Sequence, residues 1–223
     1  MSLVRQYIRE VLEAMPQIQP TSQIFCDMDG VLVNFKSAAI EAVNDLLDGQ
    51  SSKYSSITAK NIRRIQTVKD TKGKNWRATT GEDLNLKPVR NLMFSVMGLN
   101  PGMFYAGMQA HPDGVAELWP FLNSTGHQVN LLSAPIGRGT PHGMSSEEGK
   151  RIWAEQLIPS PSEIIIAPAA QKPQYATIGG IPNILIDDRA STVAAWNAAG
   201  GIAVLHIPKQ SGATIRQLRE LGL

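Results

Sequence analysis

Five short apolar runs divide the chain, and most of them are rich in β-branched residues. Within each run the apolar residues are continuous rather than alternating, and the stretches between the runs carry helical spacing. This combination predicts the strands of a parallel sheet that is covered by helices on both faces. The runs lie at residues 24–26, 129–132, 164–167, 184–186 and 202–205. The predicted fold class is therefore α/β, with a three-layer, Rossmann-like core.

Two of the predicted helices have recognisable ends. Ser145 and Glu148 have the spacing of a capping box, which is typical of the start of a helix. The alanine-rich segment 191–199 runs into Gly200 and Gly201, which is typical of a helix C-terminus. Both signals place helices between predicted strands, as a layered α/β fold requires.

The spacing of the runs is uneven, because about 100 residues separate the first from the second. A strand–helix–strand crossover needs only about 30 residues. The excess, residues 49–105, therefore predicts an inserted helical domain. The rest divides into an amphipathic N-terminal helix at 1–20 and a core domain made of residues 21–48 and 106–223.

The charge balance of the whole chain is close to neutral, but the charges are segregated. The 223 residues carry a net charge of +2, which argues against a dedicated nucleic-acid binder. Residues 53–90 hold ten Lys and Arg against three Asp and Glu, a local charge of +7. Such a segment either attracts anions or forms the solvated face of the inserted helices.

Cysteine content and hydropathy limit the class of protein. The chain has one cysteine, Cys26, so no disulfide forms within it, and 43% of its residues are hydrophobic, enough for a core. No apolar stretch approaches the roughly 18 residues of a membrane span, and the N-terminus has no apolar signal region. We expect a cytoplasmic protein without a membrane partner.

Aspartates, a serine and a lysine follow four of the predicted strands. Ligands of open α/β sheets bind beyond the carboxyl ends of the strands, so these residues are expected to lie together. Four ionised carboxylates require a cation, and carboxylate oxygens suit Mg²⁺. The residues, in chain order, are Asp27, Asp29, Ser133, Lys172, Asp187 and Asp188.

These residue types can carry out phosphoryl transfer. A carboxylate at a strand end, Asp27, can attack phosphorus as a covalent nucleophile. Asp29 can protonate the leaving oxygen and then deprotonate the attacking water. Ser133 and Lys172 would supply a hydrogen bond and a positive charge to the phosphoryl oxygens.

The same residues resemble the four motifs of the haloacid dehalogenase superfamily, in order. The matching segments are Asp27-Met-Asp-Gly-Val-Leu, a strand that ends in Ser133, Lys172, and Leu-Ile-Asp-Asp at 185–188. The resemblance implies that Asp27 is the nucleophile and Asp29 the acid and base. It also implies that Asp27, the Asp29 carbonyl and Asp188 bind Mg²⁺ with support from Asp187, and that 49–105 is a helical cap of the C1 type.

Within this superfamily the chain looks most like the 5'(3')-deoxyribonucleotidases. The residues after Asp29 include Phe35, which in that family packs against the nucleobase, and Pro101-Gly-Met-Phe-Tyr, with Phe104, resembles the return from the cap. Ser133-Ala-Pro-Ile resembles the family's Thr-Ser-Pro-Ile, with alanine in place of a serine. The resemblance implies that the substrate contacts come from Phe35, Phe104, Ala134, Ile136 and Arg138; for the two phenylalanines, packing within the cap is an equal alternative.

The sequence thus predicts a Mg²⁺-dependent phosphomonoesterase whose partner is a small phosphorylated molecule, a nucleoside monophosphate. Alternatives are a polynucleotide end phosphatase that uses the basic segment, a phosphatase of another small metabolite, and a binding module without activity. A dehalogenase would not need Asp29 as an acid. The oligomeric state stays open, with a homodimer as one option.

Overall fold

The computed structural model describes residues 16–49, 59–136, 145–159 and 161–223. Most of the predicted N-terminal helix and Arg138 lie outside these residues; the described residues 16–20 form no helix. The chain forms two compact units. The sheet unit comprises Met1–Leu32, His111–Ala134 and Ile158–Leu223, and the helical unit comprises Val33–Ala110 and Pro135–Leu157. The helical unit thus takes in more of the chain than 49–105, and the role of that segment as a cap stays a prediction.

The sheet unit is built on five parallel strands, which confirms the predicted α/β class. The strand order is β3-β2-β1-β6-β7, with β1 between its two partners β2 and β6. The three inner strands are fully buried, which explains why their sequences are continuously apolar. The strands are β1 (Ile24–Cys26), β2 (Val129–Ser133), β3 (Glu163–Ile166), β6 (Ile184–Asp187) and β7 (Ile202–Leu205).

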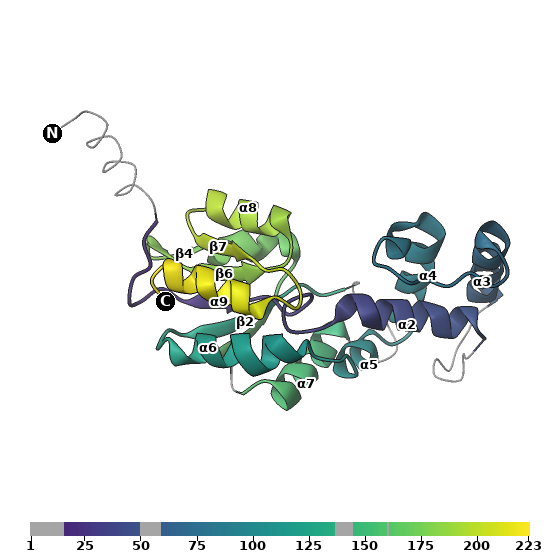
Figure 1. Cartoon of the computed structure of the whole chain (residues 1–223), viewed down its shortest axis with the longest axis horizontal. Helices are drawn as coiled ribbons and strands as arrows, with labels where there is room; N and C mark the ends of the chain where they lie inside the picture. Colours follow the sequence, from purple (N-terminus) through teal and green to yellow (C-terminus); the bar gives the residue numbers. More distant parts are fainter. Residues whose placement is uncertain (1–15, 50–58, 137–144, 160) are drawn as a thin grey trace. The chain divides into compact units, whose positions relative to one another are not determined.

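Helices lie on both sides of this sheet (Figure 1). In the figure α8 (Ala190–Ala198) lies on one side and α6 (Trp119–Ser124) on the other. Gly200 follows α8 with a φ of 89°, which confirms the predicted helix end. The unit also contains η3 (Gly114–Leu118), η4 (Ala169–Tyr175), α9 (Ser211–Glu220) and the hairpin of β4 (Thr177–Ile178) and β5 (Ile181–Pro182).

The helical unit has its own hydrophobic core, in which apolar residues of α2 meet those of α4. Asn44 of α2 fixes the loop before α4, because its side chain donates to the Ala78 carbonyl at 2.8 Å and accepts from the Ala78 N–H at 2.9 Å. The helices are α2 (Phe35–Leu47), α3 (Ala59–Lys72), η2 (Asp83–Asn85), α4 (Lys87–Met97), α5 (Pro101–Ala106) and α7 (Ser146–Leu157).

The start of α7 confirms the predicted capping box. The Ser145 N–H donates to Glu148 Oε2 at 2.7 Å, and the Glu148 N–H donates to Ser145 Oγ at 3.1 Å. These hydrogen bonds lower the pKa of Glu148. Within the same helix Gly149 lies so close to α5 that a Cβ atom would stand 2.1 Å from the Gly102 carbonyl oxygen.

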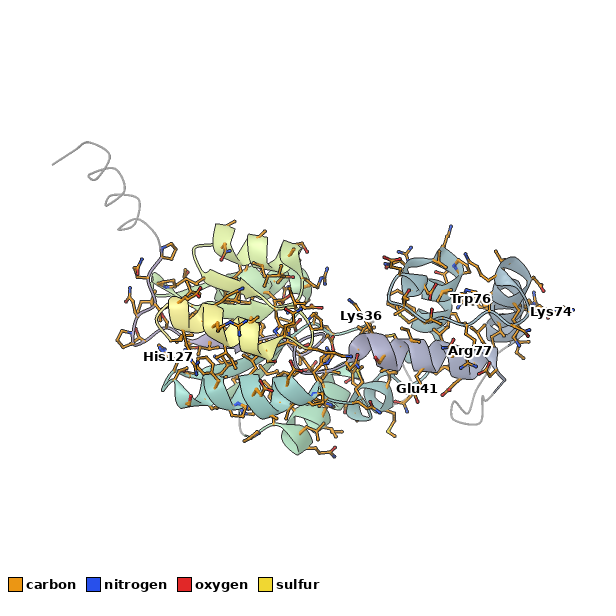
Figure 2. All side chains as sticks on the ribbon, in the orientation of Figure 1. Lys36, Glu41, Lys74, Trp76, Arg77 and His127 are labelled. Carbon is orange, nitrogen blue, oxygen red and sulfur yellow. The ribbon has the colours of Figure 1, made fainter. Side chains whose placement is uncertain are left out.

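The described part of the basic segment, residues 59–90, runs through α3, the loop after it, η2 and the start of α4. Figure 2 labels Lys74, Trp76 and Arg77 in that loop. Arg77 pairs with Asp48, Arg64 donates to the Ser95 hydroxyl, and Trp76 packs against the core of the helical unit. Several of these side chains therefore stabilise the unit itself. No helix in the described residues has both the length and the apolar character that a membrane span needs.

Candidate active site

Two neighbouring strands bring the first and last acidic motifs together. Asp27 directly follows β1, and Asp187 is the last residue of β6. The two strands are paired in parallel, with Cys26 opposite Ile186, and the Asp27 N–H donates to the Ile186 carbonyl at 2.8 Å. The register therefore places both carboxylates at the same edge of the sheet, as predicted.

Lys172 joins these two carboxylates from η4. Its Nζ lies 2.9 Å from Asp27 Oδ1 and 2.7 Å from Asp187 Oδ2. All three side chains are buried, with exposed fractions of 3% for Lys172, 6% for Asp27 and 0% for Asp187. Burying charges carries a large desolvation cost, so this arrangement is a weak source of stability but a strong constraint on where each atom lies.

The pKa values reflect this balance. Burial disfavours the charged form of Lys172, but attraction from Asp27 and Asp187 outweighs it, and the net pKa of Lys172 is raised above its ordinary value. For Asp187, burial and then repulsion from Asp27 raise the pKa, and the ammonium of Lys172 opposes them. One cation is thus shared between two carboxylates that would otherwise repel each other.

A third carboxylate completes a cluster that fits a divalent cation. Asp27, Asp187 and Asp188 each offer an oxygen, and these atoms lie within 4.8 Å of one another. Both Asp187 oxygens already have partners, since Oδ2 binds Lys172 and Oδ1 accepts from the Arg189 N–H at 2.9 Å. The hard carboxylate oxygens of this cluster suit Mg²⁺.

Gly30 holds the loop after β1 against Asp188, a contact that motif spacing did not indicate. Its φ is 81°, and a Cβ atom at this position would lie 2.2 Å from Asp188 Oδ2. Only glycine combines this backbone conformation with this approach. The signal that could have indicated it is the glycine directly after the Asp-Met-Asp turn.

The other predicted chemical residues lie near the same strands. Asp29 is half-buried in the loop after β1, and Ser133 is the buried last residue of β2, which is the other neighbour of β1. The carboxylate of Asp29 is not part of the acidic cluster found among the described residues. Its role as acid and base, and that of its carbonyl as a metal ligand, stay predictions, as does the role of Ser133.

The predicted substrate residues are divided between the two units. Ala134 ends a segment of the sheet unit, whereas Phe35, Phe104 and Ile136 belong to the helical unit. The rings of Phe35 and Phe104 pack edge to face with their centroids 6.2 Å apart. Phe35 and Ile136 pack against the helical core, and Phe104 also lines a cavity of that unit.

The fold resembles solved structures of low sequence identity. No family model and no curated protein matches the chain. A haloacid dehalogenase-like family hydrolase from Xanthomonas campestris matches with a TM-score of 0.50 and 12% identity, over 93% of this chain and 97% of that one. A hydrolase from Streptococcus pneumoniae TIGR4 matches with a TM-score of 0.49 and 14% identity, over 91% and 100%. At these identities the first match shows the fold, and the chemistry has to be argued from the site.

Proposed function

We propose that this chain is a Mg²⁺-dependent phosphomonoesterase of the haloacid dehalogenase superfamily, with Asp27 as its nucleophile. The observation that carries the proposal is the buried contact of Lys172 with both Asp27 and Asp187, beside Asp188. A structural ion pair needs one carboxylate for one ammonium. Two buried carboxylates on one lysine leave an excess of negative charge, which a divalent cation and a phosphoryl substrate would balance together.

The first step is attack on phosphorus by Asp27. Its Oδ1 is held by Lys172 at 2.9 Å, so Oδ2 is the oxygen that forms the bond to phosphorus. The bond from phosphorus to the ester oxygen breaks as the new bond forms, and Asp29 gives its proton to the leaving oxygen. Mg²⁺ held by Asp27 and Asp188 would supply positive charge to the phosphoryl oxygens.

The second step is hydrolysis of the aspartyl-phosphate. Asp29, now a carboxylate, takes a proton from a water molecule as the water oxygen bonds to phosphorus. The bond between phosphorus and Asp27 breaks, inorganic phosphate leaves, and the Asp27 carboxylate is regenerated. Lys172 and Ser133 stabilise the charge on the transferring group, because phosphoryl transfer depends mainly on positioning and electrostatics.

For the substrate, we propose a nucleoside monophosphate. The support is the resemblance of the Asp27–Phe35 segment and of Ser133-Ala-Pro-Ile to deoxyribonucleotidase motifs. An acid at Asp29 favours phosphate ester cleavage over dehalogenation, in which the leaving halide needs no proton. The single buried thiol of Cys26 is compatible with the reducing cytoplasm that we propose as the location.

Phosphate release from a panel of esters tests the proposal. The panel contains dUMP, dTMP, AMP, a sugar phosphate and a 3'-phosphorylated oligonucleotide, each with Mg²⁺ and with a chelator. We expect release that needs Mg²⁺, favours the deoxynucleoside monophosphates and falls at least about a thousandfold in Asp27→Asn. Asp48→Asn, an equivalent change on the helical unit, serves as the control and should leave release unchanged. No release from any ester would overturn the proposal, and release from the other esters alone would remove only the nucleotide assignment.

A further inference from the structure

The first turn of α9 (residues 211–214), the C-terminal helix of Figure 1, is connected by hydrogen bonds to both acidic segments of the candidate active site. One segment is the Asp29 turn (residues 28–32), which follows β1. The other is the end of β6 at Asp187. Both segments and α9 belong to the sheet unit.

Asp113 caps α9 from a distant part of the chain. Gln210, the N-cap residue of α9, makes no side-chain hydrogen bond to the helix, and the first turn contains no acidic residue. Instead Asp113 Oδ2 accepts from the Ser211 N–H at 3.0 Å. Burial raises the pKa of Asp113, but hydrogen bonding from Ser211 outweighs it and the net pKa is lowered. Asp113 is therefore ionised at neutral pH, and its negative charge at the helix N-terminus is favourable.

His111, two residues before Asp113, holds the end of the Asp29 turn. The His111 N–H donates to the Leu32 carbonyl at 2.7 Å, and the Leu32 N–H donates to the Met28 carbonyl at 2.9 Å. Because Met28, Leu32 and His111 are all buried, these hydrogen bonds lie away from water and are strong. The segment that contains Asp113 is thus bonded directly to the turn.

Gly114, directly after Asp113, packs against the same turn. A Cβ atom on Gly114 would lie 2.4 Å from the Val31 carbonyl oxygen and 3.3 Å from Leu32 Cα. The contact is between two backbones, so no flexible side chain is present to absorb a displacement. Movement of Asp113 relative to α9 should therefore move the Asp29 turn as well.

The first turn of α9 is connected to the end of β6 through His206. Thr214 Oγ1 and His206 Nδ1 lie 2.9 Å apart, and the His206 N–H donates to the Asp187 carbonyl at 2.9 Å. Thr214 and His206 are both buried. Because a hydroxyl can donate or accept, the Thr214 hydrogen bond forms with either tautomer of the ring. One buried side chain thus connects α9 to the second acidic segment.

We propose that the first turn of α9 holds the Asp29 turn and the end of β6 in place, with Asp113 and Thr214 as its two positioning residues. Both act through the backbone of an acidic segment rather than on the substrate. The importance of this link for catalysis rests on the proposed function, because it concerns the same carboxylates. The link itself requires no reaction.

Replacement of Asp113 tests the first connection by amide hydrogen exchange and by steady-state kinetics. In Asp113→Ala we expect the Leu32 and His111 amides to exchange at least about tenfold faster relative to Leu131 of β2. The kcat for phosphate release should fall by about ten- to a hundredfold with KM within about twofold, because a misplaced carboxylate slows the chemical step. Asp113→Asn keeps an oxygen that can cap the helix, so it should restore both readouts.

Replacement of Thr214 tests the second connection. Thr214→Val keeps the shape of the side chain but removes the hydroxyl, so the His206 ring loses its partner. We expect the His206 amide to exchange at least about tenfold faster relative to Leu131, and kcat to fall by about tenfold with KM retained. Thr214→Ser keeps the hydroxyl and should restore both readouts.

Ser145→Ala is the matched control. Like Asp113, Ser145 caps a helix with a side-chain oxygen, since its Oγ accepts from the Glu148 N–H at 3.1 Å, but it lies in the helical unit. This change should alter neither the exchange of the Leu32 and His206 amides nor kcat.

The two readouts separate this inference from the proposed function. Unchanged exchange of Leu32 in Asp113→Ala and of His206 in Thr214→Val would overturn the link, whatever the chain hydrolyses. Faster exchange with an unchanged kcat in an active chain would overturn the positioning role. A native chain that releases no phosphate refutes the proposed function, and faster exchange in the two variants would still support the link.

Discussion

The two units of this protein differ in where their charged side chains lie. The sheet unit holds charge in buried positions: Lys172 contacts Asp27 and Asp187 directly, and none of these side chains is more than 6% exposed. The cavity of the helical unit has a single charged residue, Glu41, in its lining, together with two asparagines that cap helices. Strand ends hold buried charges in fixed positions, whereas helix packing forms a cavity with a mixed polar and apolar lining.

Replacing Lys172 should cause the largest loss of stability and of phosphate release. Both losses should arise at the candidate active site of the sheet unit. Lys172→Met leaves two buried carboxylates without their cation, which should cost about 3 kcal/mol of stability and at least about a hundredfold in phosphate release. Adding Asp187→Asn should restore part of the stability but not the release, because it removes one of the two uncompensated carboxylates and leaves Asp27 without its cation. Urea unfolding and phosphate assays measure the two effects, and parallel recovery of both would show that the lysine is purely structural.

Gly149→Ala tests the packing of the helical unit. The new Cβ would lie 2.1 Å from the Gly102 carbonyl oxygen and 2.6 Å from its Cα, and these backbone atoms cannot move alone. We expect a loss of about 3 kcal/mol in the free energy of unfolding, measured by urea titration. Gly212→Ala is the control, because its Cβ would meet only an Arg216 nitrogen at 3.8 Å. Equal stability of both variants would contradict the close contact of α5 with α7.

Gly30→Ala tests the sheet unit. Compared with a second glycine of similar φ, it separates the cost of backbone strain from the effect of a Cβ contact with Asp188. Gly30 and Gly126 have φ angles of 81° and 80°, but only at Gly30 would a Cβ meet Asp188, at 2.2 Å. Alanine at either position should cost about 1–2 kcal/mol. Only Gly30→Ala should also weaken Mg²⁺-dependent phosphate release, by at least about tenfold, because the new Cβ would displace the Asp188 carboxylate that we propose as a Mg²⁺ ligand. Similar release from the two variants would be evidence against the placement of Asp188.

His206, in the sheet unit, should make the free energy of unfolding depend on pH. Burial lowers the pKa of His206 to about 4, with attraction from Asp113 opposing the shift and repulsion from His111 adding to it. The unfolded chain therefore binds more protons than the folded one between pH about 6.5 and 4. Stability should fall by about 2 kcal/mol from pH 8 to pH 5. His206→Asn should reduce this slope in urea titrations at the two pH values, and an unchanged slope would assign it to other groups.

The positions of the candidate site residues could be predicted from the sequence because the end of a buried strand fixes where the next side chain lies. Each of Asp27, Asp187 and Ser133 lies at or directly after the end of a buried strand, so an apolar run followed by a polar residue locates it. Lys172 lies on η4, six residues after β3, and was placed only by its order among the motifs. Strand boundaries were less certain, since the third run was predicted at 164–167 and the strand is Glu163–Ile166.

The cavity could not be predicted in the same way. Asn34 and Asn100 are 66 positions apart and line one cavity only because α2 and α5 belong to one packed unit. An asparagine before a helix is an ordinary N-cap. The local sequence does not show which other elements will pack beside it. Phe35, for which packing and substrate contact were equal alternatives, packs in the core and does not line the cavity.

The bridge that joins the two ends of the inserted helical segment has a consequence for folding kinetics. Ile24 pairs with Val129, so the first two strands can meet only after a loop of about 100 residues has closed. Val33 and Ala110 form a bridge, and next to it the His111 N–H donates to the Leu32 carbonyl at 2.7 Å. Once this bridge forms, the loop that remains is about 26 residues long, and its entropic cost is correspondingly smaller. We therefore expect the inserted helices to form early and the central strands to pair after them.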